Sequence, residues 1–358
     1  MTNRERIINT ALCKRVDRLP FFFYFPPWTE TEKRWRSEGL GHEDPWDRRF
    51  GFDPGCVLVD VNVGYCPAFE HTQVEDLGET EIVRDRSGIL KEQRKDGGSI
   101  PKFLEYPIKN RADWEKIRSD KLNPDDPARF PDNWDTLVDT YNKSDQAVQV
   151  GCYPYGLFGT LRDMIGVEDF LLSFYDQPEL IHDIMDYLTD FWISIYHKIC
   201  ARVKVDCIHI WEDLSGKNGS LISNTMIREF MLPNYRKIRA FADEHDIPIV
   251  ALDTDGDCMK LVPVFIEGGI NMMMPFEVAA GSDVLYYRRE YPDFSIMGGI
   301  DKQEIAKGQT EIDLELDRIA PILHGTGYFP ALDHLPHPDI SWQDFCYFVE
   351  RLKNMIGV

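Results

Sequence analysis

Eight short runs of apolar, β-branched and aromatic residues recur along the chain, separated by longer stretches with helical periodicity. The runs do not alternate with polar residues, which indicates strands that are buried on both faces of a parallel sheet. Eight strands joined by helical crossovers predict an α/β protein with a single closed (β/α)8 barrel, a TIM barrel, rather than an open sheet. The predicted strands are Phe21–Phe25, Cys56–Val61, Ala147–Cys152, Cys207–Trp211, Ile247–Leu252, Ile270–Met274, Phe294–Met297 and Tyr328–Leu332.

The segments between these runs contain helix signals. Thr2 and Glu5 have the form of a capping box at the start of a short first helix. Apolar periodicity predicts further helices at Asp169–Ser173, Glu179–Ile199 and Ile227–Glu244. An open doubly wound sheet is the alternative fold, but it would normally place a glycine-rich turn after its first strand. The residues at that point are Pro26-Pro27-Trp28, which favours the barrel.

Between the second and third predicted strands the pattern changes to an alternation of polar and apolar residues. Three such segments, Glu79–Arg84, Ile89–Arg94 and Phe103–Pro107, are separated by turns at Arg86-Ser87-Gly88 and Asp96-Gly97-Gly98. This pattern predicts a small antiparallel β meander, at about 79–107, inserted in one barrel domain of residues 1–358. Long insertions in barrels fall in the βα loops, so we expect the meander at or near the C-terminal mouth.

Charge and composition narrow the possible partners. The chain has 358 residues and a formal net charge of −21, which disfavours binding to nucleic acid or to an anionic membrane surface. The sequence also contains no apolar run long enough for a membrane span and no signal-peptide pattern at its start. The eight cysteines are widely spaced and contain no CxxC pair, which is typical of reduced thiols. We therefore expect a cytoplasmic protein.

Carboxylates follow six of the eight predicted strands, where barrel enzymes hold their catalytic groups. Helix capping explains some of them, and Asp257 and Asp283 are best interpreted as caps, while Asp301 follows a glycine pair and is equally suited to hold a turn. Like charges at one end of a barrel raise one another's pKa unless a cation or a proton lies between them. The ring therefore predicts a bound metal, a cationic ligand or acid–base chemistry. Its members are Asp60, Glu212, Asp213, Asp253, Asp255, Asp257, Glu277, Asp301 and Asp333, with His334 beside the last.

The remaining histidines and cysteines are weaker candidates. His182, His197 and His245 lie on predicted helices, where surface or capping roles are more common than ligand roles. His209 lies in a buried strand and is interpreted as a core histidine with satisfied hydrogen bonds. Cys258, close after Asp255, is the one thiol near the predicted site.

Several motifs, in order, resemble the uroporphyrinogen decarboxylase superfamily over nearly the whole chain. This superfamily contains decarboxylases of porphyrin synthesis and cobalamin-dependent methyltransferases, and the resemblance implies a (β/α)8 barrel for this chain. The motifs are Arg18-Leu19-Pro20, Phe50-Gly51-Phe52-Asp53, Ile222-Ser223-Asn224 with Phe230–Pro233, Asp255-Gly256-Asp257, Glu267–Asn271 with Pro275-Phe276-Glu277, Gly298–Lys302 and Asp333-His334.

The resemblance to the decarboxylase branch is incomplete. By that resemblance Asp60 matches the catalytic aspartate and His334 the histidine, but the tyrosine after strand three has no clear match. The arginine-rich loop that clamps substrate carboxylates is replaced by Phe25–Glu30, which contains no arginine. A polycarboxylate without such a clamp is unattractive in a chain with this charge.

The methyltransferase branch is more similar, in the inserted meander and the opening helix. Where its zinc members carry His-x-Cys and a later Cys, this chain has Asp253-Thr254-Asp255 and, roughly, Asp333-His334. The resemblance then implies a corrinoid-dependent methyltransferase that moves a methyl group from a small, possibly methoxylated donor to a corrinoid (cobalamin) held by a partner protein, as in O-demethylases. Aromatic walls are expected from Phe25, Trp28, Tyr65, Tyr155 and Trp211, and further substrate contacts from Glu277 and Asp301.

The predicted catalytic residues are Asp60, Glu212, Asp253, Asp255 and His334. Glu212, Asp255 and His334, with Asp253 in reserve and Asp333 orienting a ligand, form a set that suits Zn²⁺ with an open position. The alternative is that His334 balances the acids without a metal. Two other functions stay open: decarboxylation of uroporphyrinogen or another polycarboxylate, and non-catalytic binding of a cationic ligand.

Overall fold

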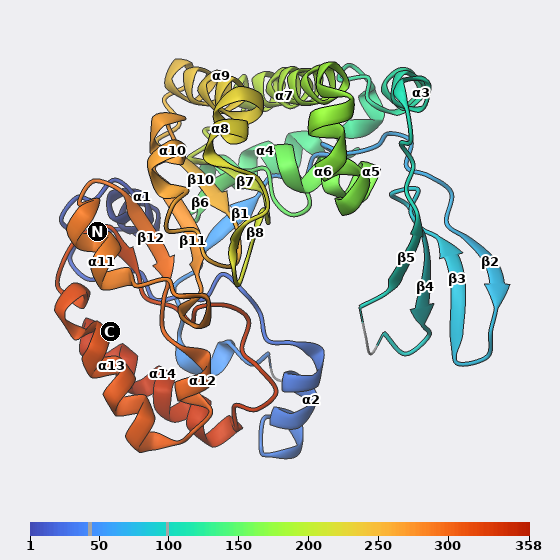
Figure 1. The fold of residues 1–358 in the computed structure, drawn as a ribbon. Coiled ribbons are helices and arrows are strands. Elements are labelled where there is room, and N and C mark those ends of the chain that lie inside the picture. The colour runs from blue at the N-terminus through green and yellow to red at the C-terminus, as the bar shows by residue number, and fades with distance from the viewer. Residues whose placement is uncertain (42–44, 98–99) are drawn as a thin grey trace.

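A computed structural model describes residues 1–41, 45–97 and 100–358, and a seven-stranded parallel sheet forms its centre (Figure 1). The strands pair in the order in which they follow one another along the chain, apart from those of a separate insertion. They are β1 (Cys56–Leu58), β6 (Ala147–Val150), β7 (Cys207–Trp211), β10 (Ile249–Asp253), β11 (Met272–Phe276), β12 (Ser295–Gly298) and β13 (Tyr328–Phe329). An isolated parallel bridge between Ile300 and Leu332 extends the last pair.

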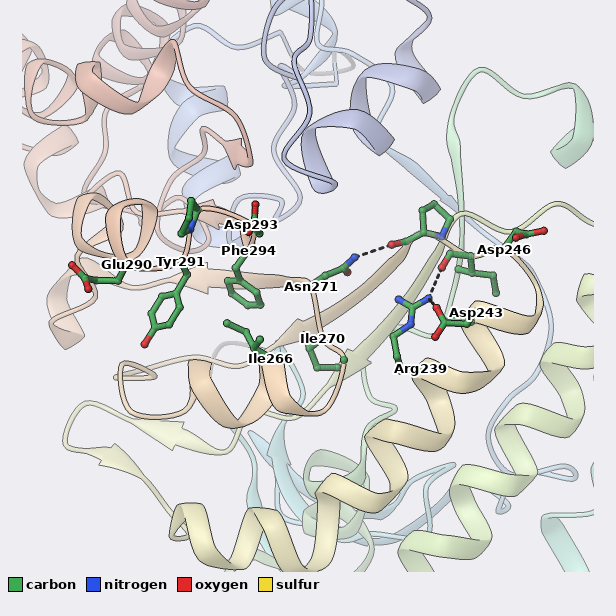
Figure 2. Close-up of a pocket in the computed structure, with 15 residues that line it drawn as sticks. Arg239, Asp243, Asp246, Ile266, Ile270, Asn271, Glu290, Tyr291, Asp293 and Phe294 are labelled. Carbon is green, nitrogen blue, oxygen red and sulfur yellow. Dashed lines mark hydrogen bonds and ion pairs between the residues drawn. The ribbon is translucent and has the colours of Figure 1, made fainter.

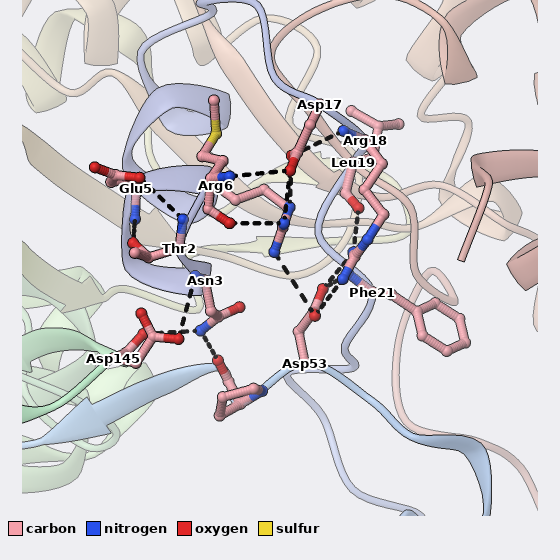
Figure 3. A network of polar contacts seen from close by, with 12 residues as sticks. Thr2, Asn3, Glu5, Arg6, Asp17, Arg18, Leu19, Phe21, Asp53 and Asp145 are labelled. Atoms are coloured by element: carbon pink, nitrogen blue, oxygen red, sulfur yellow. Dashed lines mark hydrogen bonds and ion pairs between the residues drawn. The ribbon is translucent and has the colours of Figure 1, made fainter.

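Seven of the predicted strands are therefore confirmed, and the first one, Phe21–Phe25, is wrong: the structure contains no strand there. The physical reason lies in Asp53 (Figure 3), whose carboxylate accepts the Phe21 N–H at 2.8 Å while its own N–H donates to the Phe21 carbonyl at 2.8 Å. The flanking prolines, Pro20 and Pro26-Pro27, have no N–H to donate to a sheet. A closed eight-stranded barrel is accordingly not formed by the strands of the described residues.

Some side chains of this segment nevertheless lie inside the curved sheet, whereas Phe21 belongs to the outer core. Phe22 belongs to an interior apolar cluster and packs edge-on against Phe329 at 6.1 Å, and the Tyr24 ring stacks on His209 at 5.6 Å. Successive strand residues alternate between this interior cluster and a larger outer core. In β7, for example, Cys207 faces the interior and Ile208 and Ile210 face the outer core.

Helices cover the outer face of the sheet. The α-helices are α1 (Asn3–Ala11), α2 (Thr29–Ser37), α3 (Arg111–Lys121), α4 (Trp134–Lys143), α5 (Leu157–Ile165), α6 (Val167–Asp176), α7 (Pro178–Cys200), α8 (Asn224–Met226), α9 (Leu232–Glu244), α10 (Val262–Glu267), α11 (Val284–Glu290), α12 (Lys302–Ile305), α13 (Gln309–Leu323) and α14 (Trp342–Ile356). Short helical turns occur at Arg48–Phe50, Pro127–Arg129 and Val278–Ala280, and a π-helical turn at Ile227–Met231 precedes α9. Within the described residues, no helix combines the length and the apolar character needed to cross a membrane.

Helix α1 begins with the predicted capping box, since Thr2 accepts the Glu5 N–H at 3.2 Å and Glu5 accepts the Thr2 N–H at 2.9 Å. Its apolar face joins the interior cluster through Ile7 and Ala11. Figure 3 shows the polar network that holds it, in which Arg6 forms two hydrogen bonds of 2.9 Å with the Asp17 carboxylate. Helix α1 thus contributes apolar side chains to the inside of the sheet.

The predicted meander is an antiparallel sheet of four strands: β2 (Thr72–Asp76), β3 (Thr80–Arg84), β4 (Leu90–Arg94) and β5 (Lys102–Glu105). It lies between β1 and β6 in sequence, as expected, but the strand Thr72–Asp76 was missed, and Gly98 of one predicted turn lies outside the described residues. Figure 1 shows this sheet projecting from the rest of the molecule. Its Asp85 contributes to a raised pKa of Asp163 in α5, which follows the C-terminal end of β6. The insertion therefore adjoins the C-terminal side of the sheet.

A two-stranded hairpin, β8 (Ser215–Gly216) with β9 (Gly219–Ser220), follows β7.

Candidate active site

Five ionisable side chains meet at the C-terminal ends of β10 to β13, and we call them the mouth cluster: Asp253, Asp255, Glu277, Lys302 and His334. His334 Nε2 lies 3.5 Å from Asp255 Oδ1, and His334 Nδ1 lies 3.9 Å from Glu277 Oε1. Lys302 Nζ lies 3.6 Å from the same Glu277 oxygen. The other Glu277 oxygen accepts the Gly256 N–H at 2.9 Å, which fixes the carboxylate between the loops after β10 and β11.

The pKa values in the mouth cluster favour neutral forms of its two closest partners. Burial, together with the negative charges of Asp213, Asp253 and Glu277, raises the pKa of Asp255 to about 8, although the charge of Lys302 lowers it. Burial and the charge of Lys302 lower the pKa of His334. At neutral pH the pair therefore consists of a carboxylic acid, which donates a proton, next to a neutral imidazole.

Asp333 stabilises the loops around the mouth cluster. Its carboxylate is fully buried and accepts the N–H groups of Val278 at 3.0 Å and Lys302 at 3.2 Å. Burial raises its pKa to about 6, against the lowering effect of Lys302 and of the two N–H groups. Asp333 thus orients the loops after β11 and β12. The sequence had instead suggested that it orients a metal ligand.

Asp253 faces the interior of the sheet, where Oδ2 lies 3.3 Å from His209 Nε2. His209 is buried, with 2% of its surface exposed, and neither of its ring nitrogens makes a hydrogen bond of good geometry within the described residues. The interpretation of His209 as a satisfied core histidine is therefore wrong. Because strand residues alternate, both side chains point inward, and through Asp253, whose charge acts on Asp255, His209 extends the polar site into the interior.

Glu212 is not part of the mouth cluster. It follows Trp211 by one residue and faces the outer core, on the side of Ile208 and Ile210. Its carboxylate accepts the N–H groups of Leu157, Phe158 and Gly159 at the start of α5, at 3.1, 2.5 and 3.3 Å, and the Tyr235 hydroxyl at 2.7 Å. Full burial raises its pKa to about 7, although these hydrogen bonds lower it. The hydrogen bonds of the Glu212 carboxylate thus join β7 to α5 and α9 and leave it a structural role.

The predicted zinc ligands do not fit a metal site in this arrangement. The oxygens of Glu212 are occupied by α5 and Tyr235, and the donor atoms of Glu212, Asp255 and His334 are not within 4.8 Å of one another as a set. A metal ligand set needs donor atoms at about 2.0–2.3 Å from one point. Among the described residues, no three side chains of the mouth cluster supply that convergence.

Other predicted residues lie farther out. Asp60 is exposed and makes no hydrogen bond or ion pair with the mouth cluster among the described residues. Tyr65 and Tyr155 line a separate cavity of about 80 Å³, and Tyr65 Oη is buried there without a hydrogen-bond partner in the described residues. Trp28 is 46% exposed and precedes α2. The sequence placed all four at one site, whereas in the structure only Tyr65 and Tyr155 share a cavity, which is separate from the mouth cluster.

Trp211 and Asp301 also have structural partners. The Trp211 ring packs edge-on against Tyr153 at 4.7 Å and under the Arg162 guanidinium at 4.9 Å. Asp301 accepts the Gln303 N–H at 2.8 Å and caps α12, a structural role different from the turn that the sequence offered as the alternative. Phe25 is the one predicted aromatic wall with a measured contact to the mouth cluster, since its ring lies 5.3 Å from His334.

The predicted caps are confirmed in part. Asp283 caps α11 by accepting the Leu285 N–H at 2.9 Å, whereas Asp257 accepts the Met259 N–H at 3.0 Å in a turn before α10. Cys258 is fully buried, and burial raises the pKa of its thiol to about 12. A thiol that stays protonated at neutral pH is a poor nucleophile, so Cys258 belongs to the core.

Three functional residues were missed. Lys302 directly follows Asp301 in the motif Gly298–Lys302, and this position after a predicted strand could have identified it as a candidate. Arg162 donates to the Asp213 carboxylate, and burial together with the charges of Asp213 and Asp85 raises the pKa of the neighbouring Asp163 to about 6, although Arg162 lowers it. No sequence signal identified this second acidic group, because α5 carries an ordinary amphipathic pattern.

A large cavity lies at the opposite end of the sheet. It has a volume of about 830 Å³ and is lined by residues that precede β10, β11 and β12, including Pro248, Asn271 and Phe294. Figure 2 shows it between the end of α9, at Asp243 and Asp246, and the Glu290–Phe294 loop. Because catalytic groups of such sheets lie at the C-terminal ends of the strands, this cavity is not the candidate active site.

These observations define a class: an α/β protein with parallel strands whose C-terminal ends carry an acid–imidazole–lysine cluster. The chain belongs to the uroporphyrinogen decarboxylase (URO-D) family, whose sequence profile matches residues 91–355. Among solved structures it is similar to a methyltransferase from Methanosarcina mazei, with a TM-score of 0.57, 12% sequence identity and 100% coverage of both chains. At that identity the likeness concerns the fold. No curated protein matches the sequence significantly.

Proposed function

We propose that this protein is a corrinoid-dependent methyltransferase that takes a methyl group from a small methylated donor, such as a methoxylated compound. The observation that supports this most is the pair formed by Asp255 and His334, separated by 3.5 Å, with the pKa of Asp255 raised to about 8. The methyltransferase fold of the M. mazei protein agrees with it.

A protonated Asp255 suits the removal of a methyl group from oxygen. When the O–CH₃ bond breaks, its electron pair stays on the oxygen, which needs a proton. Asp255 donates that proton, and the neutral His334 beside it stabilises the resulting carboxylate by hydrogen bonding. A Co(I) corrinoid held by a partner protein would supply the nucleophile that accepts the methyl group.

The rim of the mouth carries surface on which a corrinoid could rest. A corrinoid is a broad macrocycle, and its approach needs an open entrance with apolar contacts. Tyr153, which follows β6, is 66% exposed, and Trp28, three residues after Phe25, is 46% exposed. We propose that these two rings contact the corrinoid of the partner protein.

Decarboxylation of a polycarboxylate is supported less well by the charges. Lys302 lies within 3.6 Å of Glu277 and 4.0 Å of Asp333, and Arg162 is paired with Asp213. These cations are already neutralised, and the acids around them repel a polyanion. Simple binding of a cation is also disfavoured, because Asp255 is protonated and Lys302 adds a positive charge.

The test is to mix the protein with cob(I)alamin and a panel of methyl donors and to follow the loss of the Co(I) absorbance. Methyl transfer that depends on one donor, and is lost in Asp255→Asn but kept in Asp283→Asn, supports the proposal. The control residue Asp283 caps α11 at the surface. Conversion of uroporphyrinogen to decarboxylated products, with no methyl transfer from any donor, overturns it.

A further inference from the structure

Two helices on the outside of the sheet bring together His197, Glu244 and His245, far from the mouth cluster. His197 lies in the last turn of α7, Glu244 is the last residue of α9, and His245 follows it as the C-cap. One ligand atom from each residue lies within 4.8 Å of the other two. In the described residues this is the one group of three or more such side chains with that spacing.

The two imidazole rings face each other through one nitrogen each and share a hydrogen bond. His245 Nε2 lies 2.8 Å from His197 Nδ1, and both rings pack against Phe241, at 4.7 and 4.8 Å. In a tetrahedral zinc site with Zn–N bonds of about 2.0–2.1 Å, two nitrogens lie about 3.4 Å apart. A small rotation of either ring therefore opens the space for a cation. Because Phe241 already restricts both rings, little side-chain entropy is lost when an ion binds.

The surroundings favour a positive charge at this position. The C-terminal ends of α7 and α9 both point to it, and each carries the negative end of a helix dipole. Of the nearby cations, Lys198 is bound to Asp125 and the Pro124 carbonyl, and Arg239 to Asp243 and the Ile247 carbonyl. Neither competes for Glu244 or for the imidazoles.

We propose that His197, Glu244 and His245 form a binding site for a borderline divalent transition-metal ion, Zn²⁺, Ni²⁺ or Cu²⁺. Two imidazoles and one carboxylate are a donor set that these ions prefer, whereas Mg²⁺ and Ca²⁺ prefer oxygen ligands alone. The residues are at the surface, so the fourth position is open to water. A bound ion cross-links α7 to α9 and holds the end of α9 that borders the large cavity, where Figure 2 shows Asp243 and Asp246.

The test is calorimetric titration of the full chain, treated with chelator and then dialysed, with zinc chloride. We expect about one equivalent to bind per chain, and the affinity to fall about tenfold or more in each of His197→Ala and His245→Ala. His197 is exposed and His245 is half-buried outside the hydrophobic core, so these variants should fold normally, which circular dichroism checks. Zinc should also raise the thermal midpoint of the native protein and not that of the variants.

Two control variants separate this site from others. His182→Ala removes a histidine of the same helix α7, whose ring stacks on Phe230, and should leave zinc binding unchanged. His334→Ala removes the mouth histidine and should also leave it unchanged. Absence of zinc binding to the native protein overturns the proposal, and so does binding that is lost in His334→Ala and kept in His245→Ala.

Discussion

Asp255 and His334 come from loops after different strands and approach to 3.5 Å between Oδ1 and Nε2, with no cation placed between them. Lys302, the nearest ammonium group, is directed instead to Glu277 and Asp333. The pair therefore avoids repulsion from the neighbouring acids by keeping a proton on Asp255. That proton is the one that the proposed reaction uses.

Replacing this acid should remove activity without unfolding the protein. We expect Asp255→Asn and Asp255→Ala to lower methyl transfer by about 100-fold or more, since a positioned general acid contributes about that much. Asp253→Ala should also abolish it. The free energy of unfolding should stay the same or rise by about 1 kcal/mol, because Asp253→Ala removes one charge from a cluster of like charges and the Asp255 variants remove a buried acid that folding forces to hold a proton. Unfolding of these variants would show that the acids serve the scaffold.

The raised pKa of Asp255 also predicts a pH dependence. Activity should fall as pH rises through about 8, because Asp255 then loses its proton. Stability should change in the same direction: the folded state holds this proton more tightly than the unfolded chain, so its contribution is complete below about pH 4 and is lost as pH rises toward about 8. The stability effect should be modest, since 36% of the side chain is exposed to water. Denaturant melts of the native protein and of Asp255→Asn at pH 5 and pH 9 measure this effect. If the free energy of unfolding changes equally with pH in both proteins, the raised pKa does not belong to Asp255.

Lys302 should set the position of that pH profile. Its charge lowers the pKa of Asp255, of Asp333 and of His334. In Lys302→Met the alkaline limb of the activity profile should move to higher pH, by about half a unit to one unit. Lys307→Met, which removes an exposed lysine paired with Glu304, is the matched control and should not move it. A profile that stays in place in Lys302→Met would remove Lys302 from the site.

Glu212 should affect stability rather than chemistry. Glu212→Ala leaves three N–H groups of α5 and the Tyr235 hydroxyl without an acceptor, so we expect a loss of about 2–4 kcal/mol in the free energy of unfolding. Glu212→Gln keeps an acceptor oxygen and should recover most of that loss together with normal methyl transfer. An inactive but stable Glu212→Gln would instead support the catalytic role that the sequence suggested.

His209 should act as a positioning residue for Asp253. In His209→Leu two buried nitrogens without hydrogen bonds are removed, so the free energy of unfolding should be unchanged or rise by up to about 1 kcal/mol. The kcat should fall about tenfold with little change in KM, because Asp253 loses its polar neighbour. His209→Asn keeps a donor and should restore part of kcat. If kcat is normal in His209→Leu, the 3.3 Å approach to Asp253 has no functional meaning.

Hydrophobic pattern was enough to locate seven of the parallel strands but not to exclude one at Phe21–Phe25. That segment has the apolar composition of a buried strand, and the rings of Phe22 and Tyr24 do lie in the interior. What removes it from the sheet is a long-range hydrogen bond from its backbone to Asp53, which no local pattern reveals. The strand Thr72–Asp76 was missed for the opposite reason, since it is polar and largely exposed.

The candidate site was predictable to the level of strand ends and not to the level of side-chain direction. Asp255, His334 and Glu277 were identified because acids and imidazole follow the strands. Glu212 follows a strand equally closely, but the alternation of β7 turns it outward to α5. The sequence cannot show which of two neighbouring residues faces the interior until the register of the strand is known.

Because Phe21–Phe25 does not pair with its neighbours, the parallel sheet keeps two edges, at β1 and β13. A cleft of about 570 Å³ lies along the β1 edge, between Phe22–Tyr24 and Cys56–Leu58, and Leu58 is 44% exposed. The interior of the sheet is therefore bordered by this cleft at the β1 edge as well as by the mouth at the C-terminal ends of the strands, and we call the cleft the side slit. Amide protons of β1 have no hydrogen-bonding strand on that side, so they should exchange with solvent faster than those of β7 and β10, and the interior should open first along this slit.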